Sequence, residues 1–362
     1  MSLDKLRNRL SDLDQQILNL VATRQSVVDE IGALKQTSGQ ATRDFVREKQ
    51  VLEMARQQAL ELGISPELAE TLMELLIRSS LANQERARVR AEAHGRGRAA
   101  LIIGGGGKMG QWFAEFFDSQ GFNVTVADPD NPVDGFTQVA DWRETPDSFD
   151  VTVIAAPIGV TVEILDEIAS VGRQGLIFDI GSLKSPLKSA LKRLAANGTK
   201  VTSLHPMFGP DTNLLSGRHV LFVEVGSPDA TKEARQLFAS TMARQIEMKL
   251  EDHDRLIAYV LGLSHALNIA FFTALRESGE ELPNLADLSS TTFDAQLEVA
   301  ARVADESPQL YFEIQHLNPH GLAPLRELAK AVQQVSQIVE SGDEAAFVEL
   351  MEQGRRYLAE RR

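Results

Sequence analysis

The sequence contains no cysteine, which excludes disulfide bonds, thiolate nucleophiles and cysteine-ligated zinc. Its seven histidines form no HExxH motif or other paired spacing, so we expect no bound metal. The sequence also lacks a run of 18 apolar residues, and its start lacks the apolar core of a signal peptide. The last two absences favour a soluble, cytoplasmic protein, whereas the lack of cysteine says little about the compartment.

Basic residues are also in short supply, with 37 Lys and Arg against 51 Asp and Glu. The resulting net charge of −14 argues against nucleic acid as a partner. Residues 1–90, however, balance 13 basic side chains against 13 acidic ones, so the acidic excess lies after them. This neutral segment leaves room for a local cationic pocket.

From Leu3 to Leu34, apolar residues recur at steps of three and four, which predicts one long helix. Arg24 occupies a position of this apolar seam, where a guanidinium without an anion costs several kcal/mol. Arg7 and Lys35 share one flank but lie 28 residues apart, roughly 42 Å along a helix. They can serve one ligand only from different chains, so the pattern predicts a shared site for a small anion. An ordinary coiled coil, with Arg24 in solvent or paired with an acid, is the alternative.

Two further helices are predicted before a change of pattern at Ala99. One begins near residues 42–44 and ends at Leu62, and another begins at residues 65–67 and ends near Arg90. The glycine-punctuated residues 92–98 predict a linker. Short apolar runs then alternate with helical stretches, which is typical of a parallel, doubly wound sheet. The strand candidates are residues 99–103, 122–127, 150–156, 175–180, 200–204 and 219–225.

Helices are predicted again from about Leu250 to the last residue. Residues 256–275 are almost wholly apolar, although Ser264, His265 and Asn268 lie among them. A helix that is apolar on all sides is buried, most simply in a subunit interface. Membrane insertion is the alternative, which the three polar residues oppose.

A glycine-rich turn directly follows the first predicted strand. Residues 105–110 fit the pattern G-x-G-x-x-G, whose glycines permit a tight turn and a close approach to a pyrophosphate. The next strand ends at Asp128, 18 residues after Gly110, where a carboxylate can bind a ribose 2′-hydroxyl group. No arginine follows it, so the pattern favours NAD over NADP, and a turn without a cofactor is the alternative. The expected cofactor-binding residues are Gly105, Gly107, Lys108, Met109, Gly110 and Asp128.

Polar and cationic side chains follow two of the later strands. His205 comes directly after the fifth predicted strand, where it can accept a proton from a hydroxyl group. Ser182 and Lys184 follow the fourth strand and are expected to face the same crevice. The helical region adds His253, His265 and Arg302. Together these six side chains form a hydrogen-bonding and cationic set that suits an anionic, hydroxylated substrate of hydride transfer.

The chain as a whole resembles the bifunctional chorismate mutase–prephenate dehydrogenases. In the first 90 residues the resemblance rests on LRNRLSDLDQQILNLVATR, EIGALK, RDFVRE and SSLANQ. It implies an all-helical mutase whose site is shared between two chains, with Arg24 and the partner's Arg7 on the substrate carboxylates. Lys35 and Gln84 would reach the ether oxygen. The resemblance completes the pocket with Asp44, Arg47, Ser80 and Glu48, the last near the ring hydroxyl group.

Later segments resemble prephenate dehydrogenase, namely GGGGKMG, DIGSLK, LHPMFGPD, the His253-Asp254 pair and LSHAL. This resemblance implies oxidative decarboxylation with NAD, in which His205 accepts the proton of the 4-hydroxyl group. Arg302 would bind a substrate carboxylate, assisted by Ser182, Lys184, His253 and His265. Some bifunctional relatives carry an arginine where Asp294 aligns, which leaves open what holds the second carboxylate.

The expected domains are an all-helical mutase domain (1–91), a linker (92–98), a Rossmann NAD-binding domain (99–248) and a helical substrate and dimerisation domain (249–362). No regulatory domain is expected after Arg362. We expect a homodimeric enzyme of tyrosine biosynthesis that converts chorismate to prephenate and then to 4-hydroxyphenylpyruvate.

Three alternatives remain open at this point. The same two reactions on the 4-amino-4-deoxy analogues fit the motifs nearly as well, because His205 could bond to an amine. A 6-phosphogluconate-dehydrogenase-like enzyme fits less well, because no lysine occurs between Lys249 and Lys330. A non-catalytic NAD-binding regulator with a helical dimerisation arm would not need Arg24 in its apolar seam.

Overall fold

A computed structural model describes residues 2–360 of the chain. The chain divides into two compact units: residues 1–156, 164–180 and 192–247 form the first, and residues 157–163, 181–191 and 248–362 form the second. Residue 1 and residues 361–362, at the outer ends of the first and last predicted domains, lie outside the described residues. The first unit includes the predicted linker, residues 92–98, together with the segments on both sides of it. The four predicted domain ranges stay predictions.

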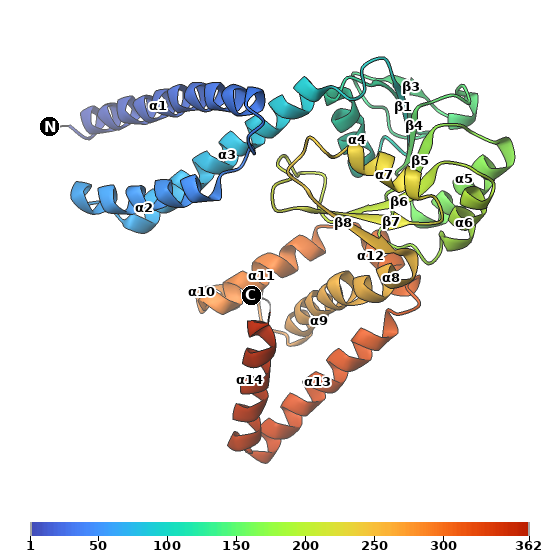
Figure 1. Ribbon diagram of the computed structural model, residues 1–362. Helices are drawn as coiled ribbons and strands as arrows, with labels where there is room; N and C mark the ends of the chain where they lie inside the picture. Colours follow the sequence, from blue (N-terminus) through green and yellow to red (C-terminus); the bar gives the residue numbers. More distant parts are fainter. Residues whose placement is uncertain (1, 361–362) are drawn as a thin grey trace. The chain divides into compact units, whose positions relative to one another are not determined.

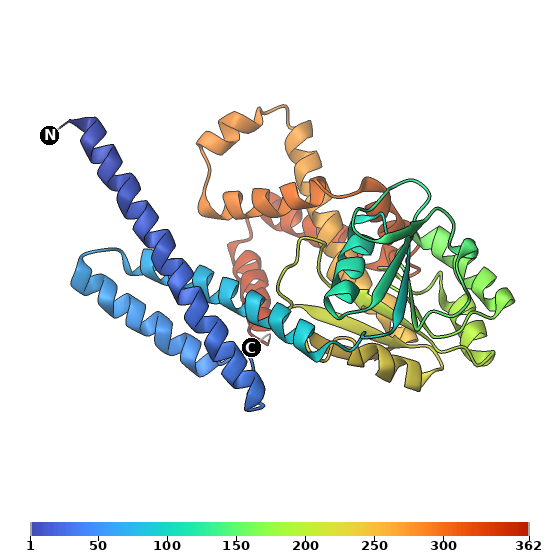
Figure 2. The same ribbon diagram turned by 90° about the horizontal axis from the view of Figure 1, so that it is seen from above.

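Three long helices open the first unit at the places that the sequence predicts (Figure 1). The side chains of Ser2, Asp44 and Ser65 each accept a backbone N–H three residues further on, which caps the three helices. Gly63 ends the second helix with a φ of 70°, which costs glycine no steric strain. The first two helices both pack along the third (Figures 1 and 2). Their bounds are α1 Leu3–Thr37, α2 Phe45–Leu62 and α3 Pro66–Glu92.

The apolar seam of α1 is uncovered in the single chain. Leu3, Leu10 and Leu20 are between 59% and 69% exposed, and no residue of this helix is buried. Figure 2 shows the N-terminal half of α1 extending away from the other two helices. An apolar stripe of this length on a water-facing helix favours association with another surface.

An eight-stranded sheet forms the rest of the first unit, in the order β3-β2-β1-β4-β5-β6-β7-β8. All six predicted strands are present, and the two that the sequence did not predict are the edge strands β3 and β8. The predicted parallel sheet is confirmed for β1 to β6, whereas β6 and β7 pair antiparallel, which the sequence did not predict. The strands are β1 Ala99–Ile103, β2 Asn123–Ala127, β3 Thr137–Val139, β4 Val151–Ile154, β5 Leu176–Asp179, β6 Val201–Pro206, β7 His219–Glu224 and β8 Arg244–Lys249.

The few aromatic residues of the chain are concentrated beneath the sheet's first helix. Phe113 and Phe117 of α4 (Lys108–Ser119) are fully buried, with their rings tilted against each other. The same two rings lie edge-on to those of Phe178, Phe122 and Phe238. Such pairs stabilise a core beyond the area that they bury. The helices that follow α3 up to residue 236 are α4 Lys108–Ser119, η1 Trp142–Glu144, α5 Ile158–Val171, α6 Lys188–Ala196 and α7 Pro228–Gln236.

The second unit is helical, as predicted. One run, Leu250–Glu277, is long and apolar enough to cross a membrane by length and composition alone. It contains a π-helical stretch, and its residues Leu256, Tyr259, Val260 and Leu267 are about half exposed. The helices are α8 Leu250–Ile257, η2 Ala258–Leu263, α9 Ser264–Glu277, α10 Leu282–Asp287, α11 Thr291–Ala304, α12 Pro308–His316, α13 Leu322–Ser341 and α14 Glu344–Ala359.

Candidate functional site

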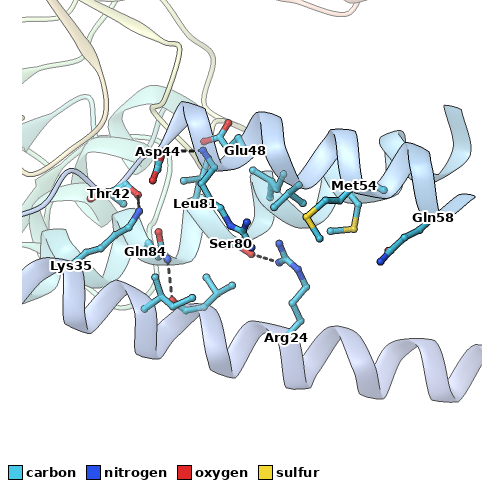
Figure 3. A pocket seen from close by; sticks show the side chains of 17 residues that line it. Arg24, Lys35, Thr42, Asp44, Glu48, Met54, Gln58, Ser80, Leu81 and Gln84 are labelled. Carbon is cyan, nitrogen blue, oxygen red and sulfur yellow. Dashed lines mark hydrogen bonds between the residues drawn. The ribbon is translucent and has the colours of Figure 1, made fainter. Parts of the chain in front are cut away.

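A cavity of about 420 Å³ lies among α1, α2 and α3 (Figure 3). Most of its wall is apolar, and the polar side chains that interrupt it come from all three helices. Seven of the eight mutase-site residues that the sequence nominates line this cavity: Arg24, Lys35, Asp44, Arg47, Glu48, Ser80 and Gln84. The fold therefore brings residues up to 60 positions apart in the chain around one space.

Arg24 is turned inward rather than to solvent. Its Nη1 donates to the hydroxyl oxygen of Ser80 at 2.7 Å and to the carbonyl oxygen of Leu76 at 3.3 Å. Among the described residues it has no carboxylate partner, and burial lowers the pKa of its guanidinium below the ordinary value. Neither version of the ordinary coiled-coil alternative matches this geometry. A half-buried cation held only by neutral oxygens is suited to an incoming anion.

Two more nitrogen donors enter the cavity from α1 and α3 (Figure 3). The Nζ of Lys35 donates to the carbonyl oxygen of Thr42 at 2.9 Å. The Nε2 of Gln84 donates to the carbonyl oxygen of Val28 at 3.0 Å. Each bond fixes the direction of its side chain while hydrogens remain on the nitrogen, so both groups can donate to a ligand.

Gly32 determines how Gln84 lies against α1. A Cβ atom at Gly32 would stand 3.1 Å from Cγ of Gln84, so the Gln84 side chain would have to shift slightly to make room for it. Glycine inside a helix costs about 1 kcal/mol relative to alanine. At this position glycine leaves room for the Gln84 side chain, which the sequence interpretation missed although a glycine within a long helix was a visible signal.

Gly32→Ala should stabilise α1 and raise the melting temperature, yet lower mutase kcat/KM by about tenfold because Gln84 is displaced. Gly354→Ala is the matched control, since a Cβ there, in the helix α14, meets nothing within 4 Å. Steady-state kinetics and thermal unfolding of both variants test this. Equal mutase activity in the two variants would contradict the role of Gly32.

The acidic side of the cavity is formed at the start of α2. Asp44 caps the helix, accepting the N–H of Arg47 at 2.9 Å. The Glu48 carboxylate receives a two-pronged bond from Arg43, whose Nε and Nη2 each lie 2.9 Å from one oxygen. Arg43 itself does not line the cavity. Arg43, which lies outside the cavity, thus fixes the orientation of the Glu48 carboxylate and partly neutralises its charge.

Arg7 is the one nominated mutase residue outside the cavity. Its side chain is 69% exposed and lies 3.8 Å from the carboxylate of Asp4, on the first turns of α1. A loose, exposed ion pair of this kind is worth little. The side chain is therefore free to meet a ligand bound elsewhere.

The glycine-rich turn connects β1 to α4 within the first unit. Gly104 has a φ of 77° and approaches the backbone of Ala155, and a Cβ at Gly110 would stand 2.3 Å from the carbonyl oxygen of Gly104. The sequence interpretation missed Gly104, although the run of four glycines pointed to it. Gly107 precedes α4 without a side-chain cap, so the first N–H groups of the helix, including those of Lys108 and Met109, are available to a phosphate.

Asp128 ends the strand next to β1 and holds the turn. One carboxylate oxygen accepts the N–H of Gly106 at 3.0 Å, and the other accepts that of Asn131 at 2.9 Å. Asp128 therefore stands beside Gly105 and Gly107, where the sequence predicts a ribose-binding carboxylate. The donor set fits a dinucleotide, with open amides for the phosphates and an acid for the ribose.

His205 lies within β6 of the first unit, where it pairs with Leu221, rather than after the strand as predicted. Its side chain is buried. The difference is small, because His205 is the second-last residue of this strand and still stands at its carboxyl end.

Ser182, Lys184 and His253 belong to the second unit. The last two contact a buried carboxylate, Asp254, that the sequence interpretation did not assign to a site. The Asp254 carboxylate accepts the backbone N–H of Lys184 at 2.8 Å and lies 2.6 Å from Nδ1 of His253. Burial raises the pKa of Asp254, but hydrogen bonds from His253, Ser185 and Lys184 outweigh it and lower this pKa below the ordinary value. Asp254 therefore stays charged and fixes both the loop and the imidazole.

His265 of α9 lies against the ring of Tyr311, with centroids 4.1 Å apart. Its Nδ1 is buried and has no hydrogen-bond partner within residues 2–360. Burial lowers the pKa of His265 to about 4. The imidazole is therefore neutral near pH 7, with one ring nitrogen unused.

The shifted pKa of His265 predicts how stability depends on pH. The unfolded chain binds a proton here near pH 6.5, whereas the folded chain binds it only near pH 4. The contribution of His265 to the free energy of unfolding should thus be complete above pH 6.5 and fall as pH drops toward 4. Denaturant titrations of wild type and His265→Gln at several pH values test this. A wild-type curve no steeper than that of the variant would oppose it.

Arg302 and Asp294 share α11 in the second unit. The Arg302 side chain is exposed; its Nε donates to the carbonyl oxygen of Glu298 at 3.3 Å, and its Nη2 forms a loose, exposed ion pair with the carboxylate of the same residue at 3.8 Å. Asp294 accepts a hydrogen bond from the hydroxyl group of Ser289 in the first turn of that helix. The guanidinium of Arg302 is thus available to an anion, whereas Asp294 is engaged locally.

Three family descriptions match successive parts of the chain. Residues 6–85 match "Chorismate mutase type II", residues 121–247 match "Prephenate dehydrogenase, nucleotide-binding domain", and residues 249–353 match "Prephenate dehydrogenase, dimerization domain". Among solved structures, a prephenate dehydrogenase from A. aeolicus shares the fold, with a TM-score of 0.57 at 18% identity over 73% of this chain and 98% of its own.

Full-length relatives extend over both parts. The T-protein of Enterobacter agglomerans is 26% identical over 96% of this chain and 90% of its own length, and that of Haemophilus influenzae is 24% identical over the same shares. The 4-amino-4-deoxyprephenate dehydrogenase of Streptomyces pristinaespiralis is 32% identical over 72% of this chain and 91% of its own length.

The match of residues 6–85 to a chorismate mutase and of residues 121–247 and 249–353 to prephenate dehydrogenase domains defines an enzyme that joins an isomerase to a dehydrogenase. The chain belongs to the family of bifunctional chorismate mutase–prephenate dehydrogenases. This membership confirms the resemblance seen in the sequence and excludes the non-catalytic regulator. The 4-amino-4-deoxy alternative is not favoured, because the T-proteins match nearly the whole chain.

Proposed function

We propose which residues of this chain carry out its two reactions. The enzyme rearranges chorismate to prephenate and converts prephenate to 4-hydroxyphenylpyruvate by oxidative decarboxylation with NAD, which are steps of tyrosine biosynthesis. The observation that carries the assignment of the first site is the cavity of Figure 3, in which Arg24, Lys35 and Gln84 converge.

The mutase reaction breaks a C–O bond and forms a C–C bond without a nucleophile or a base. It requires a folded substrate and positive charge where the ether oxygen gathers negative charge. Arg24 and the partner's Arg7 hold the carboxylates, and Lys35 and Gln84 donate to the ether oxygen. The smaller contacts of the pocket come from Asp44, Arg47, Glu48 and Ser80, with Glu48 at the ring hydroxyl group.

The dehydrogenase reaction uses the glycine-rich turn and His205. The turn would hold NAD, which would supply a hydride acceptor for the ring carbon that carries the hydroxyl group, while the ring carboxylate leaves as CO2. His205 accepts the proton of that hydroxyl group, so its role is that of a general base. Arg302 binds a substrate carboxylate, and the remaining substrate contacts come from Ser182, Lys184, His253 and His265.

The enzyme acts as a homodimer in this proposal. Support comes from the uncovered seam of α1, from the half-exposed apolar residues of α8 to α9, and from the match of residues 249–353 to a dimerization domain. Arg7 and Lys35 lie at opposite ends of α1, so only a second α1 can supply both to one ligand. A cytoplasmic location belongs to the same proposal and fits small-molecule substrates.

The direct test supplies chorismate and NAD together and identifies the product by mass. Accumulation of 4-hydroxyphenylpyruvate with equimolar NADH supports both reactions, the rearrangement and the oxidative decarboxylation. Prephenate without NADH would leave only the mutase, and turnover of 4-amino-4-deoxychorismate with negligible turnover of chorismate would overturn the choice of ring substituent.

A further inference from the structure

Arg43 connects the mutase cavity to the dehydrogenase sheet. Two of its nitrogens bind the Glu48 carboxylate, and the third, Nη1, donates to the hydroxyl oxygen of Ser216 at 2.7 Å. The guanidinium also lies over the ring of Phe45, 4.3 Å from its centroid. Ser216 belongs to the segment between β6 and β7, far from Arg43 in the chain but within the same compact unit.

The residue before Ser216 is bound to the mutase helices as well. The N–H of Leu215 donates to the carboxylate of Glu85 at 2.7 Å, and the N–H of Met242 donates to the other oxygen of that carboxylate. Glu85 is only 4% exposed and directly follows Gln84 on α3. Leu215 is also buried and packs in the aromatic core beside the sheet. A buried carboxylate with two such partners is costly to release.

Ser216 and Leu215 therefore bond to Arg43 and Glu85, the residues that hold Glu48 and Gln84 in the cavity. Ser216 accepts the hydrogen bond of Nη1 of Arg43, whose Nε and Nη2 orient the Glu48 carboxylate. The N–H of Leu215 fixes the carboxylate of Glu85, and the preceding residue on α3, Gln84, lines the cavity. Without the Ser216 hydroxyl group, the Arg43 guanidinium keeps its two bonds to Glu48. The two side chains can then rotate together, because the bond to Ser216 no longer fixes their orientation.

We propose that Ser216, a residue of the dehydrogenase sheet region, is a positioning residue of the mutase site and acts on Glu48 through Arg43. The inference rests on the proposed function only in that Glu48 is taken to contact the substrate. It makes the mutase activity dependent on a segment outside the three mutase helices. The proposed function gives Ser216 no part in the dehydrogenase reaction.

The test compares Ser216→Ala with Ser216→Thr, which keeps the hydroxyl group. Ser216→Ala should lower mutase kcat/KM by about tenfold, while Ser216→Thr stays near wild type and dehydrogenase kcat/KM with prephenate is unchanged. Ser170→Ala is the matched control, because that exposed hydroxyl group donates to the carbonyl oxygen of Glu167 on its own helix and has no other partner within residues 2–360. Arg43→Lys, which keeps the charge but loses the two-pronged bond, should reproduce the selective mutase loss.

A double-mutant cycle separates positioning from a structural effect. In a Glu48→Gln background, Ser216→Ala should have little further effect on mutase kcat/KM, since it acts through that carboxylate. Additive losses, or equal losses of mutase and dehydrogenase activity in Ser216→Ala, would overturn the inference. If Glu48→Gln alone leaves mutase activity intact, the role of Glu48 in the proposed function fails instead. If Glu48→Gln is too slow to measure, Arg43→Ala takes its place in the cycle.

Discussion

Lys35→Ala should lower mutase kcat by about 10²–10³-fold, the usual cost of removing one donor from a site where charge develops. The Nζ of Lys35 is held by the carbonyl oxygen of Thr42 and lines a largely apolar cavity, where water replaces it poorly. Alanine leaves the ether oxygen with Gln84 alone as a donor. The loss of chorismate absorbance measures the effect.

The dehydrogenase provides the internal control for Lys35→Ala, because NADH formation from supplied prephenate should be largely unchanged. Lys49→Ala removes an exposed lysine of α2 whose ion pair with Glu53 spans 3.8 Å, and it should leave both activities near wild type. Parallel loss of both activities in Lys35→Ala would refute separate sites.

His205→Asn should lower dehydrogenase kcat by about 10²–10⁴-fold, the range for loss of a general base. Asparagine is smaller than histidine but keeps a hydrogen-bonding group in a strand where the histidine is buried, so the fold should persist. It cannot accept the proton of the substrate hydroxyl group, and hydride transfer is slowed as a result. Single-turnover formation of NADH from prephenate measures this step.

Mutase kcat provides the control for His205→Asn and should not change. His94→Asn is a second control, since this exposed histidine lies 3.3 Å from Glu92 at the end of the mutase helices. Should His205→Asn form NADH at nearly the wild-type rate, His205 would not be the base.

The long helices and most strands could be predicted because their signals are local. Ser65 and Pro66 mark a helix start by their own chemistry, and Gly63 marks an end by its positive φ. The edge strands β3 and β8 were missed because they are short or alternate with polar residues, as exposed edges require. The antiparallel pairing of β6 with β7 depends on the return path of the chain, which no local pattern encodes.

The candidate sites divide in the same way. Arg24 could be nominated because its charge breaks an apolar repeat, and the glycine turn because its pattern is short and contiguous. The bonds from Arg43 to Ser216, from Glu85 to Leu215 and from Asp254 to Lys184 join distant segments. Their residue types are ordinary on a protein surface, so only the fold reveals that these carboxylates and hydroxyl groups are buried or bound.

The central claim is that cations from two polypeptides surround one dianionic substrate. Mixing Arg7→Ala with Lys35→Ala protein under conditions that exchange subunits tests it most directly. Each variant alone should be nearly inactive as a mutase, whereas hybrid dimers hold one site with both defects and one with neither. Random exchange should then restore about a quarter of the wild-type mutase activity. Mixtures no more active than the separate variants would contradict the shared site.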